Sequence, residues 1–248
     1  MKKVALITGA SRGIGAATAS HLAGQGYDIC VNYRSDHAAA QQMVQELEKL
    51  GARAIAVQAD VSNEEDVLRL FDAVDERFGT LSALVNNAGI LLPQMMVEQM
   101  TAERINTMLT TNVTNYFLCS REAVKRMAHK HGGQGGSIVN VSSAAARLGA
   151  AGEYVDYAAS KAAVDVLTMG LSLEVADQGI RVNSVRPGFI DTEMHADGGE
   201  PNRLERLAPV IPMRRGGQAS EVAAGIAWLL SNEASYVTGT FLDVSGGR

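Results

Sequence analysis

The chain opens with an apolar run, a glycine-rich turn and a helix-forming stretch, and this unit constrains the fold more than any other feature. Residues Val4 to Thr8 are rich in β-forming side chains, and Ala16 to Gln25 have helical composition. Between them lie Gly9, Gly13 and Gly15. Glycines let a backbone turn tightly and approach a ligand, and the free N–H groups and dipole at the start of a helix suit a pyrophosphate. The spacing G-x-x-x-G-x-G differs from the common G-x-G-x-x-G fingerprint, so this turn alone is weak evidence for a dinucleotide site.

Strand-like and helix-like stretches continue to alternate, with short connections, to the end of the chain. We expect further strands at Asp28–Tyr33, Arg53–Gln58, Ala83–Asn86, Ile138–Ser142, Arg181–Val185 and Gly239–Val244. We expect helices at Ala38–Leu50, Glu64–Phe78, Thr101–His131 (one long helix or two abutting ones), Tyr157–Asp177 and Glu221–Leu230. Such alternation predicts an α/β fold: one domain over residues 1–248, with a doubly wound parallel sheet covered by helices on both faces.

One segment breaks the alternation. Residues 191–217 contain three prolines and two glycine pairs, with apolar side chains among charged ones. The segment follows the sixth predicted strand, and ligands bind at the carboxyl ends of strands in open α/β sheets. We therefore expect a mobile substrate lid here, with a passive surface excursion as the alternative.

Composition excludes several classes of protein. The 22 Lys and Arg against 27 Asp and Glu give a net charge of −5, with no basic arm for nucleic acid. No apolar run reaches the roughly 18 residues that a membrane-spanning helix needs, and no signal peptide is evident, so we expect a cytoplasmic protein. The two cysteines, Cys30 and Cys119, lack the spacing of a zinc or redox site and are expected to be buried free thiols. We expect no catalytic metal.

The best candidates for chemistry are Tyr157 and Lys161. Four residues apart on a helix, they lie on the same face, one turn from each other. Lowering the pKa of a tyrosine from about 10 to about 7 requires roughly 4 kcal/mol. An ammonium at about 4 Å supplies about that energy at an effective dielectric constant of about 20, which would make Tyr157 a general acid or base. Taken alone, however, Y-x-x-x-K is more often an incidental pair on an amphipathic helix.

The motifs together resemble the short-chain dehydrogenase/reductase family, and the resemblance covers essentially the whole chain. In the family's order they are T-G-A-S-R-G-I-G at Thr8–Gly15, Asp60-Val61, N-N-A-G at Asn86–Gly89, Asn112, Ser142-Ser143, Y-A-A-S-K at Tyr157–Lys161 and P-G-F-I-D-T at Pro187–Thr192. Each motif is weak to moderate alone, but their joint chance occurrence is very improbable. The sequence is most similar to the 3-oxoacyl-carrier-protein reductase and glucose dehydrogenase group, which implies a Rossmann fold.

The resemblance implies roles for four residues. Ser143 would hold the substrate oxygen, with Ser142 as the alternative because the interval to Tyr157 is one residue longer than the commonest pattern. Tyr157 would be the general acid or base, and Lys161 would lower its pKa and bind the nicotinamide ribose. Asn112 would help to organise a water relay to Lys161, unless it only distorts its helix through local backbone bonds.

The resemblance also implies a dinucleotide cofactor. Its binding residues would be Gly9, Ser11, Arg12, Gly13, Ile14, Gly15, Arg34, Asp60, Val61, Asn87, Ala88, Gly89, Tyr157, Lys161, Pro187, Gly188, Ile190 and Thr192. An NAD site places an acidic residue at the tip of the second strand, whereas a 2′-phosphate calls for arginine. Here the tip has no carboxylate, and Arg34 and Arg12 are available to pair with a phosphate. We predict NADP(H), with dual use of NAD(H) and a merely solvated Arg34 as alternatives.

The resulting hypothesis is an NADP(H)-dependent oxidoreductase that interconverts a small-molecule carbonyl and an alcohol. A sugar or polyol dehydrogenase and a weakly catalytic NADP(H)-sensing protein are the alternatives. The family is commonly homotetrameric through helices like Thr101–His131 and the last strand, so we expect a homo-oligomer, a tetramer. We expect no nucleic-acid or membrane partner.

Overall fold

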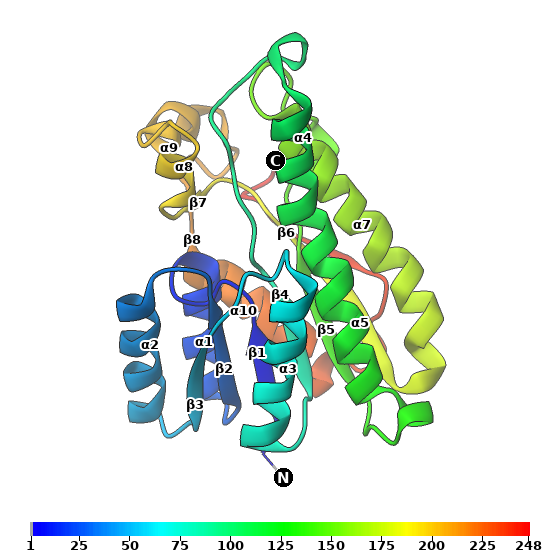
Figure 1. Cartoon of the computed structure of the whole chain (residues 1–248). Coiled ribbons are helices and arrows are strands. Elements are labelled where there is room, and N and C mark those ends of the chain that lie inside the picture. Colours follow the sequence, from blue (N-terminus) through cyan, green and yellow to red (C-terminus); the bar gives the residue numbers. More distant parts are fainter. Residues whose placement is uncertain (1) are drawn as a thin grey trace.

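A computed structural model describes residues 2–248, so Met1 lies outside the described part of the chain. Figure 1 shows a parallel sheet with helices on both sides. The strands of the main sheet are β1 (Val4–Ile7), β2 (Asp28–Tyr33), β3 (Ala54–Gln58), β4 (Ala83–Asn86), β5 (Gly136–Val141), β6 (Ile180–Pro187) and β9 (Phe241–Val244). The helices are α1 (Gly13–Gly24), α2 (His37–Lys49), α3 (Glu64–Phe78), α4 (Ala102–Leu109), α5 (Asn115–Met127), α6 (Ala145–Leu148), α7 (Val155–Val175), α8 (Met194–Asp197), α9 (Arg203–Leu207) and α10 (Ala219–Leu230).

The strand order is β3-β2-β1-β4-β5-β6-β9, and every pairing is parallel. The order reverses between β1 and β4, which is the point where an open α/β sheet forms a crevice at its carboxyl edge. This confirms the predicted doubly wound sheet.

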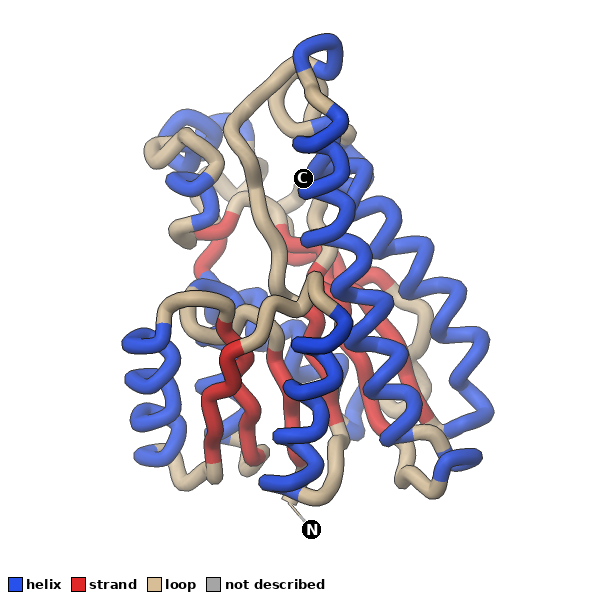
Figure 2. The backbone as a smooth tube through the Cα atoms, viewed as in Figure 1, coloured by secondary structure: helices blue, strands red, loops and turns tan. Residues whose placement is uncertain are grey.

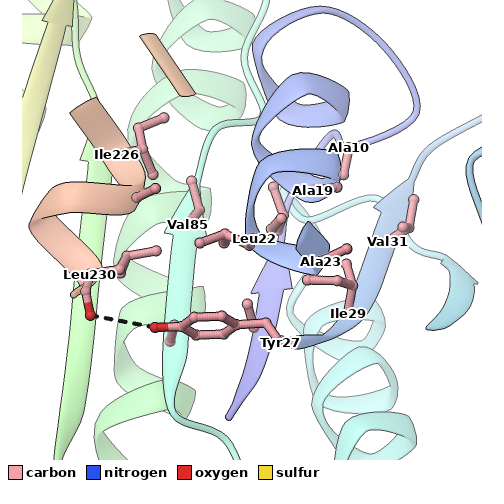
Figure 3. Close-up of a cluster of buried hydrophobic side chains, with 14 of the residues drawn as sticks. Ala10, Ala19, Leu22, Ala23, Tyr27, Ile29, Val31, Val85, Ile226 and Leu230 are labelled. Atoms are coloured by element: carbon pink, nitrogen blue, oxygen red, sulfur yellow. Dashed lines mark hydrogen bonds between the residues drawn. The ribbon is translucent and has the colours of Figure 1, made fainter. Parts of the chain in front are cut away.

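Alternate residues of each strand face the two helical layers. Ala5 and Ile7 of β1 pack with residues of α1, α2 and α10, whereas Val4 and Leu6 pack with α3, α5 and the end of α7. Figure 3 shows the first layer, where Leu22 and Ile226 approach Val85 and the Tyr27 hydroxyl donates to the Leu230 carbonyl at 3.5 Å. Burial on both faces explains the continuous apolar run of β1, Val-Ala-Leu-Ile.

Most predicted elements are present, and outside the segment 191–217 the main differences are the following. Helix α1 begins at Gly13, so the last glycines of the turn already belong to the helix. The predicted stretch Thr101–His131 contains α4 and α5 joined by a π-helical turn at Thr110–Thr114. The short helix α6 follows β5 and was not expected. The two cysteines are free and buried, as predicted.

The segment 191–217 projects beyond the carboxyl edge of the sheet, where Figure 1 and Figure 2 show α8 and α9 above the strands. Its base is a small pairing of β7 (Ile190–Asp191) with β8 (Gly217–Gln218). It also contains a 3₁₀ turn, Ala208–Val210. Both ends are thereby fixed to each other, and the excursion begins and ends beside the carboxyl end of β6.

Candidate active site

The glycine turn after β1 has the conformation that a phosphate-binding loop needs. Gly9 and Gly13 adopt left-handed backbone angles, with φ of 62° and 57°. At Gly15 a Cβ atom would lie 2.4 Å from the Gly9 carbonyl oxygen and 2.7 Å from Nδ2 of Asn87. A side chain at Gly15 would therefore collide with both the glycine turn and the loop after β4. Glycine at this position lets the two loops pack together.

That second loop, the predicted Asn87–Gly89 segment, is tied to the glycine turn by hydrogen bonds. The Thr8 hydroxyl accepts from the backbone N–H groups of Asn87 (2.9 Å) and Ala88 (3.0 Å). Asn87 in turn donates from Nδ2 to the carbonyl oxygens of Thr8 and Gly9. The two loops that flank the crevice between β1 and β4 thus form one unit, and they fit the phosphate and ribose parts of a dinucleotide.

The structure brings Tyr157 and Lys161 together on one face of α7. The ammonium nitrogen of Lys161 lies 5.7 Å from the centre of the Tyr157 ring. It donates to the Val141 carbonyl at 2.8 Å and to the Tyr116 hydroxyl at 3.1 Å. Lys161 is therefore held in place by the end of β5 and by α5.

The pKa values of this pair differ from the expectation. Burial raises the pKa of Tyr157, and the neighbouring Ser143 hydroxyl opposes that rise only in part. Burial also lowers the pKa of Lys161 to about 7, against the opposing effect of Asp165. The expected lowering of the Tyr157 pKa is thus not seen here, because burial disfavours the phenolate and only the Ser143 hydroxyl opposes that effect.

Tyr116 is a site residue that the sequence analysis missed. It is fully buried on α5, donates to the Val141 carbonyl at 2.8 Å and accepts from Lys161. Its ring also lies 5.0 Å below the Lys161 ammonium. Only its placement within a helix directly after the predicted Asn112 could have suggested this role, and that signal is weak.

The two adjacent serines have different surroundings. Ser142 is buried, and its hydroxyl donates to the Lys161 carbonyl at 3.1 Å, which ties β5 to α7. Ser143 lies beside the Tyr157 phenol, and its oxygen accepts from the Ala145 N–H at 3.1 Å. The geometry favours Ser143 as the serine that meets a substrate.

Asn112 lies in the π-helical turn between α4 and α5 and is fully buried. Its side chain accepts from the Ile90 N–H at 2.8 Å and donates to the Ile90 carbonyl at 2.9 Å. A Cβ on Gly89 would lie 3.1 Å from its Oδ1 and 3.6 Å from Nζ of Lys161. Asn112 therefore holds the loop after β4 next to Lys161, while π-turns of this kind are frequent at functional sites.

The predicted adenine and ribose contacts lie at the opposite end of the crevice. Asp60 accepts from the Ser62 N–H and hydroxyl through one oxygen, and Asp66 holds its backbone N–H. Val61 is buried. Arg34 is exposed after β2, and among residues 2–248 it forms no ion pair. Ser11 and Ile14, which belong to the glycine turn and the start of α1, are partly buried.

Arg12 has a partner that the sequence did not suggest. Its guanidinium lies 2.6 Å from the Asp197 carboxylate of α8, and both side chains are about half exposed. This ion pair joins the glycine turn to the segment 191–217. Thr192 also approaches the turn, because a Cβ on Gly13 would lie 3.5 Å from its methyl group.

A cavity of about 380 Å³ opens between these elements. Ser143, Tyr157 and Lys161 line it, and so do Asn87 and Ile14 from the cofactor side. The predicted Pro187–Thr192 loop contributes Pro187, Gly188, Ile190 and Thr192 to its wall. The predicted lid contributes Met194, His195, Arg203 and Leu207. The proposed proton-transfer groups and the cofactor crevice therefore share one cavity.

Two possible features are absent from the part of the chain that the structure covers. Within residues 2–248, no group of three or more His, Cys, Asp or Glu side chains could hold a metal ion. Over the same residues, none of the helices is long and apolar enough to cross a membrane.

Comparisons with known proteins agree with this geometry. The family model described as enoyl-(acyl carrier protein) reductase matches residues 9–248. The chain is 63% identical over 245 residues to the uncharacterized oxidoreductase YgfF of Escherichia coli, covering 99% of each chain. It is 38% identical to glucose 1-dehydrogenase 2 of Bacillus subtilis, covering 99% of this chain and 94% of that one.

A solved structure supports the same conclusion. A short-chain dehydrogenase from Burkholderia cenocepacia, crystallised with NADP, superposes with a TM-score of 0.90 at 36% identity, covering 99% of this chain and 97% of that one. The likeness therefore extends over nearly the whole of both chains. The chain belongs to the short-chain dehydrogenase/reductase family of oxidoreductases.

Proposed function

We propose that the chain is an NADP(H)-dependent oxidoreductase that interconverts a carbonyl and an alcohol. The observation that carries the proposal is the single cavity shared by Ser143, Tyr157, Lys161 and the loops of the cofactor crevice. When bound there, NADP(H) supplies or accepts the hydride. The chain's own residues must then hold the substrate oxygen and move one proton.

Ser143 and Tyr157 divide these two tasks. The Ser143 hydroxyl binds the carbonyl oxygen, and the Tyr157 phenol donates a proton to it during reduction. Burial keeps the pKa of Tyr157 above its usual value, so the phenol is protonated at neutral pH, which is the form that reduction needs. Oxidation requires the phenolate, which Lys161 stabilises when it carries its positive charge.

The loops around the cavity support the remaining assignments. Gly9, Gly13 and Gly15 would receive the pyrophosphate, and Asp60 with Val61 would meet the adenine. Asn87–Gly89, Asn112 and Pro187–Thr192 would shape the nicotinamide end. We also infer that residues 191–217 act as a substrate lid, because they supply one wall of the cavity.

Tyr157→Phe tests the proton transfer. Removing the general acid should lower kcat for reduction of an accepted ketone by about 10² to 10⁴, and NADPH titration measures any separate loss of cofactor binding. Tyr236→Phe is the matched control, because it removes the same hydroxyl from a fully exposed ring. Full turnover by the Tyr157 variant would refute the mechanism.

The preference for NADP(H) rests on Arg34 and Arg12. Arg34 is exposed at the tip of β2 with its charge uncompensated by any residue in the described range, so a 2′-phosphate could reach it. The neighbour from Burkholderia cenocepacia was crystallised with NADP, which is consistent with this choice. Binding titrations with NADPH and NADH should show tighter NADPH binding, and a tenfold preference for NADH would contradict the proposal.

The proposed homotetramer and its place in the cell follow the family. Val166, Met169 and Leu173 recur at helical spacing on α7 and are exposed, as is Phe117 on α5. This stripe supports association of helices from two subunits. We propose a cytoplasmic enzyme on small-molecule substrates, and a monomer in sedimentation experiments would contradict the assembly.

A further inference from the structure

His195 presents two polar atoms whose partners are missing from the chain. Both ring nitrogens are buried, and neither has a hydrogen-bond partner among residues 2–248; the Ile190 backbone lies near the ring but outside hydrogen-bonding geometry. Buried polar atoms are almost always paired. Since His195 lines the same cavity as Tyr157, a molecule bound in the cavity is positioned to supply the missing partner.

A water molecule bound to the His195 nitrogens before the substrate enters does not remove the need for a polar substrate group. A substrate that displaces such a water loses affinity unless it reproduces the hydrogen bonds. A substrate with only apolar atoms near His195 would therefore leave buried nitrogens unpaired and bind less tightly. The ring selects for a polar group on the substrate.

The charges around His195 indicate which polar group fits. Arg203 is buried and pairs with Glu153 and, at 2.8 Å, with Glu200. Arg206 pairs with the same two carboxylates, at 3.1 Å in the case of Glu153. Two cations and two anions cancel, so this wall offers no free charge to an anionic substrate.

The same neighbours keep the ring neutral. Burial and the Arg203 guanidinium lower the pKa of His195 below its usual value. A neutral imidazole has one donor and one acceptor nitrogen. A hydroxyl group suits either nitrogen, because it can donate to the bare nitrogen or accept from the N–H.

The rest of the lining is largely apolar. Leu91, Leu148, Phe189, Met194 and Leu207 face the cavity. Above the sheet, α8 and α9 carry the His195 side of this wall (Figure 1). The substrate therefore needs an apolar skeleton between its reacting carbonyl and its second polar group.

We propose that His195 is a specificity-determining residue that binds a second, non-reacting hydroxyl of the substrate. The preferred substrates are then hydroxylated ketones, or the corresponding diols, with an apolar skeleton. This inference rests on the proposed carbonyl reduction and adds the substrate class. Residues 191–217 would then determine substrate specificity as well as cover the substrate.

The test uses linear methyl ketones of increasing length, each with and without a terminal hydroxyl, and with NADPH as the reductant. For the length that reaches His195, the wild-type enzyme should favour the hydroxylated ketone by about tenfold in kcat/KM, the value of one hydrogen bond of about 1.4 kcal/mol. His195→Leu should abolish that preference mainly by raising KM for the hydroxylated ketone. His195→Gln, which keeps a donor and an acceptor, should restore part of it.

Controls separate this inference from the proposed function. Glu193→Gln changes an exposed neighbour outside the cavity wall and should behave like wild type. NADPH titration of every variant reports folding independently of turnover. Equal kcat/KM for plain and hydroxylated ketones, unchanged in His195→Leu, would overturn the inference while leaving carbonyl reduction standing. A preference for terminal carboxylates would overturn it as well, and NADPH binding without reduction of any ketone would overturn both.

Discussion

Lys161 is a buried cation, and its replacement by methionine should stabilise the free protein more at low pH than at high pH. Its side chain is 3% exposed, and burial lowers its pKa from 10.5 to about 7. The unfolded chain keeps the ordinary pKa. Between about pH 7 and pH 10.5 the unfolded chain therefore binds more protons than the folded one, and the free energy of unfolding rises with pH.

The size of the effect follows from that shift. Keeping Lys161 in the folded protein costs roughly 5 kcal/mol at or below about pH 6, where the lysine is charged in both the folded and the unfolded chain, and roughly 2 kcal/mol at about pH 9, where the folded lysine is neutral. Methionine does not titrate. Its advantage over lysine should thus shrink by about 2–3 kcal/mol between these pH values.

A second contribution does not depend strongly on pH. Lys161 donates to the Val141 carbonyl and the Tyr116 hydroxyl, and methionine loses both bonds. This loss lowers the stability of the variant by about 1–3 kcal/mol at every pH. The loss shifts the free energy of unfolding of the variant by the same amount at every pH. The informative quantity is therefore how the stability difference between wild type and Lys161→Met changes with pH.

Urea denaturation of wild type and Lys161→Met at both pH values, at one protein concentration, measures that change. Lys130→Met is the control, because Lys130 is exposed and should give the same difference at both pH values. A constant difference between wild type and Lys161→Met would show that the buried lysine keeps an ordinary pKa, and the reasoning would be refuted. The variant should also lose turnover, as expected where a site keeps a destabilising group for function.

Two further variants test the cofactor loops. Gly15→Ala places a methyl group 2.4 Å from the Gly9 carbonyl, so it should lower both NADPH affinity and, by about 1–3 kcal/mol, stability; Gly24→Ala in the same helix meets no atom within 4 Å and should do neither. Equal melting temperatures and NADPH affinities for the two variants would contradict the tight packing of the turn. Asp197→Ala frees Arg12 from its ion pair. If Arg12 meets the 2′-phosphate, NADPH should bind up to about fivefold more tightly, as expected for an exposed pair, whereas NADH titrations should be unchanged; an equal effect on both cofactors would exclude that role.

The alternating pattern of the sequence was sufficient to predict the sheet and its helices. The apolar runs that became β1 and β2 are buried on both faces, so their assignment did not depend on knowing their neighbours. Boundaries were less certain where the chain changes geometry gradually. Helix α1 takes in Gly13 and Gly15, and the π-turn around Asn112 interrupts a stretch whose composition is helical throughout.

The parts of the site that the sequence did not reveal depend on contacts between distant segments. Tyr116 approaches Lys161 only because α5 and α7 pack against the same end of β5. His195 has buried, unpaired nitrogens only because residues 191–217 fold back to form one wall of the cavity. No local spacing distinguishes either residue from an ordinary buried tyrosine or surface histidine.

The pKa values of Tyr157 and Lys161 show why a single pairwise interaction is not enough to predict the charge state of a buried group. A pairwise estimate gives about 4 kcal/mol of attraction between a phenolate and an ammonium at about 4 Å. Lowering the Lys161 pKa from 10.5 to about 7 corresponds to roughly 5 kcal/mol against its charged form. The two effects are of similar size, so the charge state depends on burial, which the sequence does not show. Lys161 therefore titrates near neutral pH, where a small change in its surroundings, such as an occupied cofactor crevice, decides whether it can stabilise the Tyr157 phenolate.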